Sequence, residues 1–411
     1  MSLPDLASFV RDWDQARRTE EPALVFAPAE YLHRQERVRA LMAARDIDTL
    51  LVSSPEGMCY LHGYNPRWYR AQAPTAWPAL AVTVVRADDE RLIHFDFPQE
   101  AELIRRTSVI SDVRLYSARH EADDALRMLA GELASAGWLN GTVGLEMHSY
   151  IPNRAISELV EAALSDLGAH VVDGSAIVRM ARRIKSDPEL RVIERAAEIA
   201  DAGLKALIRA ARPGMTELQL WAQMMSAMID AGGEPAAIHE LVLIGGLERG
   251  HAMSGHDSLR SGDTFLADPC GVVHRYHANI ARTFVLGAPA PELRYLLRAA
   301  GDAVDLLCEV AKVGTPLREV NRALRACYID CGIWDLRTWA GGYELGLSFP
   351  PDWVGESTFS VDDGAADAVI EHGTVTSFHS NFRFALVDTV LFTDGGTRAL
   401  SQLPRGPIAI A

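Results

Sequence analysis

The first half of the chain alternates between two hydrophobic periodicities. Apolar residues recur with helical spacing over residues 29–45, and a short run of branched and leucine side chains follows at Thr49–Ser53. Further strands are predicted at Leu80–Ala87, Arg91–Phe97 and Thr142–Glu146, and helices at Asp123–Ala136 and Arg154–Leu167. Helices that interleave with strands in this way are typical of an α/β layer domain. We therefore predict an α/β N-terminal domain over residues 1–175, with the weakly patterned residues 1–26 as an arm.

A long helix opens the second half. The segment 183–189 contains Asp187 as a candidate N-cap, followed by Pro188 at the first helical position, and the helical pattern continues to about Ala211. A second helix begins at once, because Thr216 and Gln219 have the spacing of a capping box.

The pattern of the second half then repeats. Strands are predicted at Phe265–Asp268, Ile280–Leu286, Val375–Phe378 and Leu386–Phe392, and two helices lie between the strand pairs at Glu292–Val313 and Leu317–Cys331. Two helices and two strands, followed by the same again, form an internal near-repeat. The seam between such copies is a common place for a small-molecule site. We predict a second domain over residues 176–411.

Composition and charge narrow the functional classes. The 411 residues carry a formal charge of −15, which argues against nucleic acid or an anionic membrane as the main partner. No apolar run reaches the roughly 18 residues of a membrane span, and the N-terminus lacks the apolar region of a signal peptide. Five scattered cysteines without a Cys-x-x-Cys pair predict a cytoplasmic protein with no disulfide framework and no thiolate zinc site.

Histidines provide the first candidate chemistry. Six of the thirteen lie in or beside the strands of the second half: His251, His256, His274, His277, His372 and His379. The run from His274 to His277 follows Asp268. It is either a solvated surface hairpin or a hairpin whose imidazoles share a cavity with the carboxylate, and the spacing alone does not separate these readings.

Two aromatic segments provide the next candidates. The stretch 342–356 combines Tyr343 in a glycine-rich loop, a Pro-Pro pair, Trp353 and Glu356. Trp353 is either a stacking plate for a cation or planar ring, or a side chain packed under the loop. The stretch 64–70 contains Trp68, Tyr69 and several arginines, an unusual composition for a connecting loop.

Several motifs carry a family resemblance across residues 28–405. They are Arg183-x-Lys185-Ser186-x-x-Glu189, the Gly262-Asp263 strand, the Arg282-Thr283-Phe284 ending and the Gly342-x-x-x-Gly346-Leu347 loop. In order and spacing this set resembles the creatinase/aminopeptidase P superfamily, which includes methionine aminopeptidase. The resemblance implies a creatinase-type N-terminal domain and an α+β pita-bread catalytic domain.

The resemblance also locates the metal ligands of the family's peptidases. Those ligands are Asp, Asp, His, Glu and Glu, and the positions fall on Asp268, Asn279, Tyr343, His379 or its neighbours, and Val387. One carboxylate remains, whereas two neighbouring divalent ions need several. We expect a metal-independent enzyme without a cofactor.

Metal-free relatives give a closer comparison. The catalytic histidine of creatinase falls on His251, but its two glutamates fall on Ala281 and near His379, which argues against creatine as the substrate. The run Phe349-Pro350-Pro351-Asp352-Trp353-Val354-Gly355-Glu356, with the preceding glycine loop and the Arg275-Tyr276-His277 hairpin, resembles the ectoine hydrolases. At position 268 this chain has Asp where the ectoine hydrolases have Glu. At position 344 it has Glu where they have a small residue.

The resemblance implies hydrolysis of a non-peptide C–N bond in a small zwitterionic compound. The expected reaction opens the ring of ectoine or 5-hydroxyectoine to N-acetyl-diaminobutyrate. Another cyclic amidine, amide or guanidino compound is the alternative substrate class. Two further alternatives are a lyase, such as one acting on dimethylsulfoniopropionate, and a non-catalytic binding domain.

Roles follow for the candidate residues. We expect Asp268 to attack the electrophilic carbon, His251 to shuttle protons and Tyr343 to stabilise developing charge. Alternatively, Asp268 orients an imidazole such as His277, which then acts as the base. Substrate contacts are expected from seven further side chains: Trp353, Glu356, His274, His277, His379, Trp68 and Tyr69. The family also implies a homodimer in which one subunit's N-terminal domain covers the neighbour's site.

Overall fold

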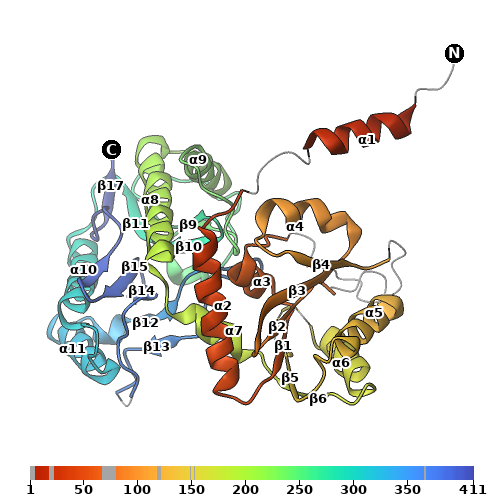
Figure 1. Cartoon of the computed structure of the whole chain (residues 1–411). Helices are drawn as coiled ribbons and strands as arrows, with labels where there is room; N and C mark the ends of the chain where they lie inside the picture. The colour runs from red at the N-terminus through yellow and green to blue at the C-terminus, as the bar shows by residue number, and fades with distance from the viewer. Residues whose placement is uncertain are drawn as a thin grey trace. The chain divides into compact units, whose positions relative to one another are not determined.

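The chain divides into two compact units. The computed structural model describes residues 5–17, 23–66, 80–117, 122–148, 150–151, 153–364 and 367–411. Contacts separate Met1–Ala181 from Arg182–Ala411 (Figure 1). The division falls after Ala181 rather than at the predicted residue 175, because most of the following helix, with Ile177 and Val178 buried, belongs to the first unit.

The first unit is built on a six-stranded sheet. Its strand order is β4-β3-β2-β1-β5-β6, and the central strand β1 pairs antiparallel with β2 and parallel with β5. The strands are β1 Thr49–Val52, β2 Val82–Arg86, β3 Asp89–Asp96, β4 Asp112–Leu115, β5 Thr142–Leu145 and β6 His170–Asp173. All four strands predicted in this half are present, within a few residues of the predicted bounds.

Helices accompany these strands in the first unit. They are α1 Leu6–Arg17, α2 Pro28–Ala43, α3 Pro55–His62, the 3₁₀ turn η1 Pro98–Glu100, α4 Ala101–Thr107, α5 Ala122–Ser135, α6 Arg154–Ser165 and α7 Ala176–Arg183. A core of aliphatic and aromatic side chains from α5, α6 and the sheet holds the unit together. The predicted arm is partly wrong, because residues 6–17 form helix α1.

Two long helix pairs organise the second unit. They are α8 Asp187–Ala210 with α9 Glu217–Asp230, and α10 Pro291–Val310 with α11 Leu317–Asp330. Ser186, not Asp187, caps α8: its hydroxyl accepts from the Glu189 amide while the Glu189 carboxylate accepts from the Ser186 amide. Asp187 instead occupies the first helical position. The Thr216 capping box of α9 is confirmed.

Three sheets complete the second unit. Their orders are β17-β11-β8-β7, β13-β12-β14-β15-β16 and the hairpin β10-β9. The strands are β7 Leu241–Ile244, β8 Thr264–Asp268, β9 Cys270–Val273, β10 Tyr276–Asn279, β11 Arg282–Leu286, β12 Trp339–Glu344, β13 Thr358–Ser360, β14 Thr374–Asn381, β15 Val387–Thr393, β16 Gly396–Ala399 and β17 Ile408–Ile410. Short 3₁₀ turns occur at η2 Leu247–Arg249 and η3 Trp334–Leu336.

The near-repeat is visible in matching contacts after the two helix pairs. Gly214 donates its amide to the Leu259 carbonyl, and Gly314 donates to Ile370 in the corresponding place. Isolated bridges join Thr216 to Ser258 and Pro316 to Val369. Reciprocal backbone bonds between Ala281 and Val387 then link the two larger sheets. The two copies of the near-repeat therefore meet in the region of β8, β10, β14 and β15.

Close packing fixes the hairpin that carries Asn279. An added Cβ at Gly271 in β9 would lie 1.8 Å from the Ala196 carbonyl oxygen of α8, so only glycine permits this approach. Helices α10 and α11 form a separate core with the five-stranded sheet. In the described part of the chain, no helix is long and apolar enough to cross a membrane.

Candidate active site

Asp268 ends strand β8 and lies beside the end of β10. Its Oδ1 accepts a hydrogen bond of 2.7 Å from Nδ2 of Asn279, the last residue of β10. The same amide nitrogen also donates to the Pro269 carbonyl at 3.2 Å. The orientation of Asn279 is therefore fixed, with its carbonyl oxygen turned away from Asp268.

Two chains of hydrogen bonds, called donor lines below, end on this oxygen, Asn279 Oδ1. In the first, the Tyr343 hydroxyl lies 3.4 Å from Asn279 Oδ1, and Trp353 Nε1 donates to the Tyr343 hydroxyl at 3.1 Å. Tyr343 comes from β12 and Trp353 from the loop after it. Each group in this line donates toward Asp268, which places the carboxylate at the accepting end.

The second line runs along strand β14. Ser377 Oγ donates to Asn279 Oδ1 at 3.0 Å and lies 3.2 Å from Nε2 of His379. Asn381 Nδ2 lies 3.2 Å from Nδ1 of the same ring. The amide can only donate there, so His379 carries its proton on Nε2 and passes it toward Ser377. Burial, together with the charge of His251, lowers the pKa of His379 to about 3, which keeps the imidazole neutral.

Aromatic rings form one wall of the site. The ring centroids of Trp339 and His379 are 4.7 Å apart, those of Tyr343 and His379 are 5.0 Å apart, and Trp339 stacks on Tyr343 at 6.3 Å. Register explains the grouping, because Tyr343 pairs with Ser377 and Gly341 with His379 across β12 and β14. Such faces suit a flat or cationic group.

Burial sets the protonation of the reacting groups. It raises the pKa of Asp268 to about 6, although the Asn279 hydrogen bond and the charge of His251 act in the opposite direction. Burial and the negative charge of Asp268 raise the pKa of Tyr343, so its phenol remains a donor at neutral pH. His251 is exposed in the loop before β8, electrostatically coupled to both Asp268 and His379.

His277 does not fit the role of a base. Its Nδ1 donates to the Arg275 carbonyl at 2.9 Å, and its Nε2 accepts from the Ala237 amide at 3.1 Å. Burial lowers its pKa to about 3. Because both ring nitrogens are engaged by the backbone, the alternative in which Asp268 orients His277 as the base lacks a free nitrogen.

The other candidate contacts separate into three groups. Trp353 is buried with its indole nitrogen turned to Tyr343, which agrees with a side chain packed under the loop, and its role as a stacking plate stays a prediction. His274 and Glu356 are exposed, His274 at the turn of the β9–β10 hairpin. Trp68 and Tyr69 lie outside the described residues.

Sequence reasoning missed several site residues. Asn279 appeared only as a lost ligand, whereas it joins the two donor lines to Asp268. Ser377 was missed although it lies two positions before the predicted His379 on β14, a signal that a strand pattern contains. Glu240, directly before β7, is buried near Asp268 and had no sequence signal beyond one charge before an apolar strand.

The residues at the family's ligand positions do not fit a pair of divalent ions. Asn279 directs its amide nitrogen, a donor, toward Asp268, and Val387 has no ligating atom. Among the residues that the structure describes, no group of three or more His, Cys, Asp or Glu side chains is placed to hold a metal ion. Glu344, next to Tyr343, is engaged in a buried ion pair of 2.6 Å with Lys185.

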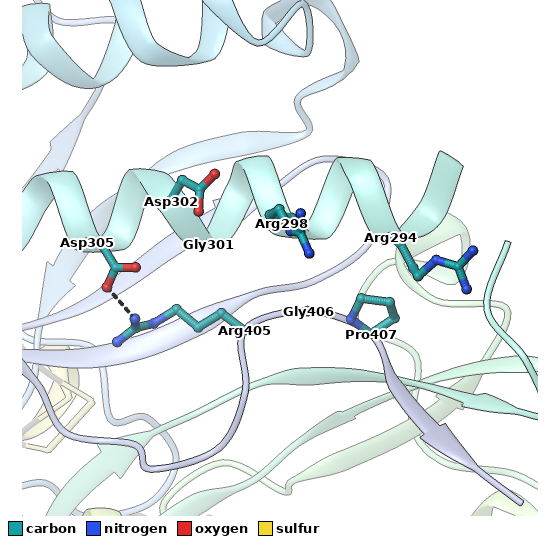
Figure 2. A pocket seen from close by; sticks show the side chains of 8 residues that line it. All are labelled: Arg294, Arg298, Gly301, Asp302, Asp305, Arg405, Gly406 and Pro407. Atoms are coloured by element: carbon teal, nitrogen blue, oxygen red, sulfur yellow. Dashed lines mark hydrogen bonds and ion pairs between the residues drawn. The ribbon is translucent and has the colours of Figure 1, made fainter. Parts of the chain in front are cut away.

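A separate cavity lies along helix α10. The cavity has a volume of about 280 Å³. Figure 2 shows its lining residues: Arg294, Arg298, Gly301, Asp302, Asp305, Arg405, Gly406 and Pro407. One of its arginines, Arg405, is already paired with Asp305 and Asp388. None of the candidate site residues lines it, so it is distinct from the network around Asp268.

Two family models match consecutive parts of the chain. The creatinase/prolidase N-terminal domain matches residues 34–184, and metallopeptidase family M24 matches residues 191–394. Ectoine hydrolase of Halomonas elongata is 26% identical over 93% of this chain and 98% of its own length. An Xaa-Pro dipeptidase of Pyrococcus horikoshii is 25% identical over 65% of this chain and 75% of its own.

Solved structures share the fold. X-Pro aminopeptidase of Thermotoga maritima superposes with a TM-score of 0.75 at 17% identity, covering 91% of this chain and 100% of that one. The N-terminal domain of the FACT complex subunit SPT16 of Cicer arietinum gives 0.70 at 17% identity, covering 93% and 99%. At these identities the likeness concerns fold alone, and it confirms the predicted creatinase-type domain followed by a pita-bread domain.

Proposed function

Because the chain belongs to the creatinase/aminopeptidase P superfamily, we propose that it is a metal-independent hydrolase of a non-peptide C–N bond. The substrate is a small zwitterion, ectoine or 5-hydroxyectoine, whose ring opens to N-acetyl-diaminobutyrate. One observation carries this proposal: Asp268 accepts from Asn279, so a neutral donor stands where the peptidases of the family have a second metal-binding carboxylate. The likeness to ectoine hydrolase supports the choice of substrate.

Asp268 is the nucleophile in this proposal. Its free oxygen adds to the amidine carbon, and the C–N bond breaks with its electron pair passing to the leaving nitrogen. His251 delivers a proton to that nitrogen and then takes one from water. The hydroxide attacks the carboxyl carbon of Asp268, so the original Asp268 oxygen leaves in the product and a water oxygen replaces it. The step needs no oxidant and no metal.

Neighbouring groups support that chemistry. Tyr343 stays protonated, and its proton can turn from the long 3.4 Å contact with Asn279 to the charge that develops on the substrate, a contribution typically worth about 3 kcal/mol. The rings of Trp339 and His379 offer a face for a flat substrate. Trp353 holds the Tyr343 hydroxyl in place. Glu356 and the exposed His274 remain proposed contacts for the polar groups of the substrate.

Assembly belongs to the same proposal. We infer a homodimer in which residues 64–70 of one subunit, Trp68 and Tyr69 among them, reach the pocket of its partner. The resemblance to creatinase-like enzymes suggested this arrangement, and the aromatic and basic composition of the segment favours it.

A substrate panel in excess chelator tests the function. The panel contains ectoine, 5-hydroxyectoine, creatine, a cyclic amide, an Xaa-Pro dipeptide and dimethylsulfoniopropionate, and product formation is followed by NMR. We expect ring opening of the ectoines at the same rate with and without chelator, and a loss of about 10³-fold for Asp268→Asn. Turnover of the dipeptide that requires added manganese would contradict the proposal, and so would an Asp268→Asn variant that keeps a tenth of the rate.

A further inference from the structure

Glu240 is a buried carboxyl group without a complete set of partners. The residue is 5% exposed, and its Oε1 has no hydrogen-bond partner among the described residues. Buried polar atoms in folded proteins are nearly always paired, so an orphaned carboxylate oxygen needs an explanation. The position is close to the candidate site, because Glu240 directly precedes β7 and Leu241 of that strand pairs with Asp268.

Among the described residues, no cation is one of the main groups that act on Glu240. Burial and, to a smaller extent, the negative charge of Asp268 raise the pKa of Glu240 to about 7. The main groups that oppose this shift are neutral: the backbone amides of Ala236 and Glu240 itself and the indole of Trp221. The Trp221 Nε1 is buried and faces this carboxyl group without reaching hydrogen-bond distance of it. The Glu240 Oε1 therefore lacks a close donor among the described residues.

Asp268 adds a second carboxyl group to the same region. The charges of both carboxyl groups act on the buried Cys270 thiol and raise its pKa. Among the described residues, the exposed His251 is the titratable group that favours ionised Asp268. A buried and a partly buried carboxyl group with a single imidazole acting on them form a site that lacks positive charge.

The neighbouring rings indicate what kind of charge is missing. Tyr343, Trp353 and Trp339 lie on the Asp268 side, and Trp221 lies against Glu240. Aromatic faces combined with carboxylates are the usual environment of an organic cation. A metal ion fits less well, because no described cluster of ligating side chains is placed to hold one.

We propose that Glu240 determines substrate specificity by binding a protonated nitrogen of the substrate through its unpartnered Oε1. The site then selects a cationic amidinium ring over a neutral ring of the same shape. This inference rests on the proposed hydrolase function and narrows its substrate class. Asp268 attacks the carbon, while Glu240 holds the nitrogen that carries the charge.

Binding measurements test this selection. Ectoine, a cationic amidine, and a neutral lactam of matching shape are titrated calorimetrically into Asp268→Asn protein, which does not consume them. We expect the added change Glu240→Gln to weaken ectoine binding by about 10–100-fold and to leave lactam binding unchanged. Glu240→Met, which also removes the charge, should reproduce the loss. Glu234→Gln is the matched control, because Glu234 accepts from the His274 and Arg275 amides and should not alter the preference.

The outcomes separate this inference from the hydrolase function. If Glu240→Gln binds ectoine as tightly as its parent while the wild type still opens the ring, the inference is wrong and the function stands. If the wild type turns over no member of the panel, the function fails. A preference for ectoine that depends on Glu240 would still support the inference in that case. Absence of any ectoine binding to Asp268→Asn protein would overturn the inference about Glu240.

Discussion

Asp268 receives its hydrogen bonds from neutral donors that are themselves fixed. Asn279 donates to it, and Tyr343 and Ser377 donate in turn to Asn279, so the polarity of the whole network points toward one carboxylate oxygen. This arrangement restricts the orientation of the Asp268 side chain without neutralising its charge. The second carboxylate oxygen is left for chemistry, at a pKa of about 6 that leaves the group mostly ionised near neutral pH.

Removing the Tyr343 hydroxyl tests its role directly. We predict that Tyr343→Phe lowers kcat by about 10–100-fold, because the donor toward the developing charge is lost while the ring and its stacking remain. Steady-state kinetics on the preferred substrate measure this. Tyr328→Phe is the control: Tyr328 is a buried tyrosine that shares a hydrogen bond with Ser380, outside the network, so the turnover of this variant should match the wild type. Equal losses in the two variants would contradict the assignment.

The buried charge of Glu240 has a predictable cost in stability. Its folded pKa of about 7 exceeds the ordinary value of 4.5, so the folded state holds the proton more tightly between those values. The contribution of Glu240 to the free energy of unfolding is fully present below pH 4.5 and is lost as the pH rises through 7. Glu240→Gln avoids that loss, and we expect it to be more stable than the wild type at pH 8 by about 2 kcal/mol and equal to it at pH 4. Denaturant unfolding at both pH values measures the difference; a less stable variant at pH 8 would contradict the burial argument.

At the residue level the sequence located Asp268 at the end of its strand better than it described the surrounding residues, and the role of Asp268 as nucleophile stays a prediction. Asp268 was found because it ends a predicted strand at the seam of the repeat. The role of Asn279 and the burial of Glu240 depend on pairing between β7, β8 and β10, which brings together residues that are distant in sequence. No local pattern contains that information.

The β9–β10 hairpin is a structural element rather than a set of catalytic imidazoles. His277 ties it to the chain before β7 through the Ala237 amide, and Tyr276 donates to the Glu189 carboxylate of α8. Gly271 allows the hairpin to lie against α8. The hairpin thereby fixes Asn279, and through it Asp268.

We predict that His277→Ala destabilises the protein by about 1–3 kcal/mol at pH 7.5, because it leaves the buried Ala237 amide unpaired. The folded pKa of His277 is about 3, below its ordinary value of 6.5, so its stability is present above pH 6.5 and lost as the pH falls toward 3. The difference in the free energy of unfolding between His277→Ala and the wild type should therefore shrink as the pH falls from 6.5 toward 3. His274→Ala, at the exposed turn, should stay within about 0.5 kcal/mol. Equal effects of the two changes in thermal unfolding would contradict this reading.

Element boundaries were largely predictable, and the exceptions have physical causes. The Ser186 and Asp187 residues both suit an N-cap, and the reciprocal bonds with Glu189 decide in favour of Ser186. Helix α1 lies in a strongly charged segment, and the sequence reading treated this segment as an arm without regular structure. The sequence reading of β14 captured its apolar half, whereas the strand continues to Asn381 with its polar side chains in the site.

At the scale of the whole molecule, shared sites predict complementation between subunits. Asp268→Asn protein and protein with Trp68→Ala and Tyr69→Ala are each expected to be nearly inactive. After the two are unfolded together and refolded, half of the dimers combine both types, and one of their two sites is intact. We predict recovery of about a quarter of the wild-type activity. A monomer by light scattering, or no recovery in the mixture, would contradict the proposed assembly.

Metal independence is a second property of the whole molecule. The ligand positions of the family hold Asn279, Tyr343 and Val387, so we predict substoichiometric metal in the purified protein and an unchanged rate in excess chelator. Elemental analysis and a parallel rate measurement decide this. A rate that falls in chelator and returns with manganese or zinc would contradict it.

The central claim is that Asp268 attacks the substrate, and oxygen labelling tests it most directly. One equivalent of ectoine is converted by the enzyme in ¹⁸O-water, and mass spectrometry is applied to the product and to the peptide that contains Asp268. We predict unlabelled product after this single turnover and one ¹⁸O atom in the Asp268 carboxylate, because the carboxylate gives its own oxygen to the product. Labelled product with an unlabelled Asp268 would show that water attacks the substrate itself, and would contradict the claim.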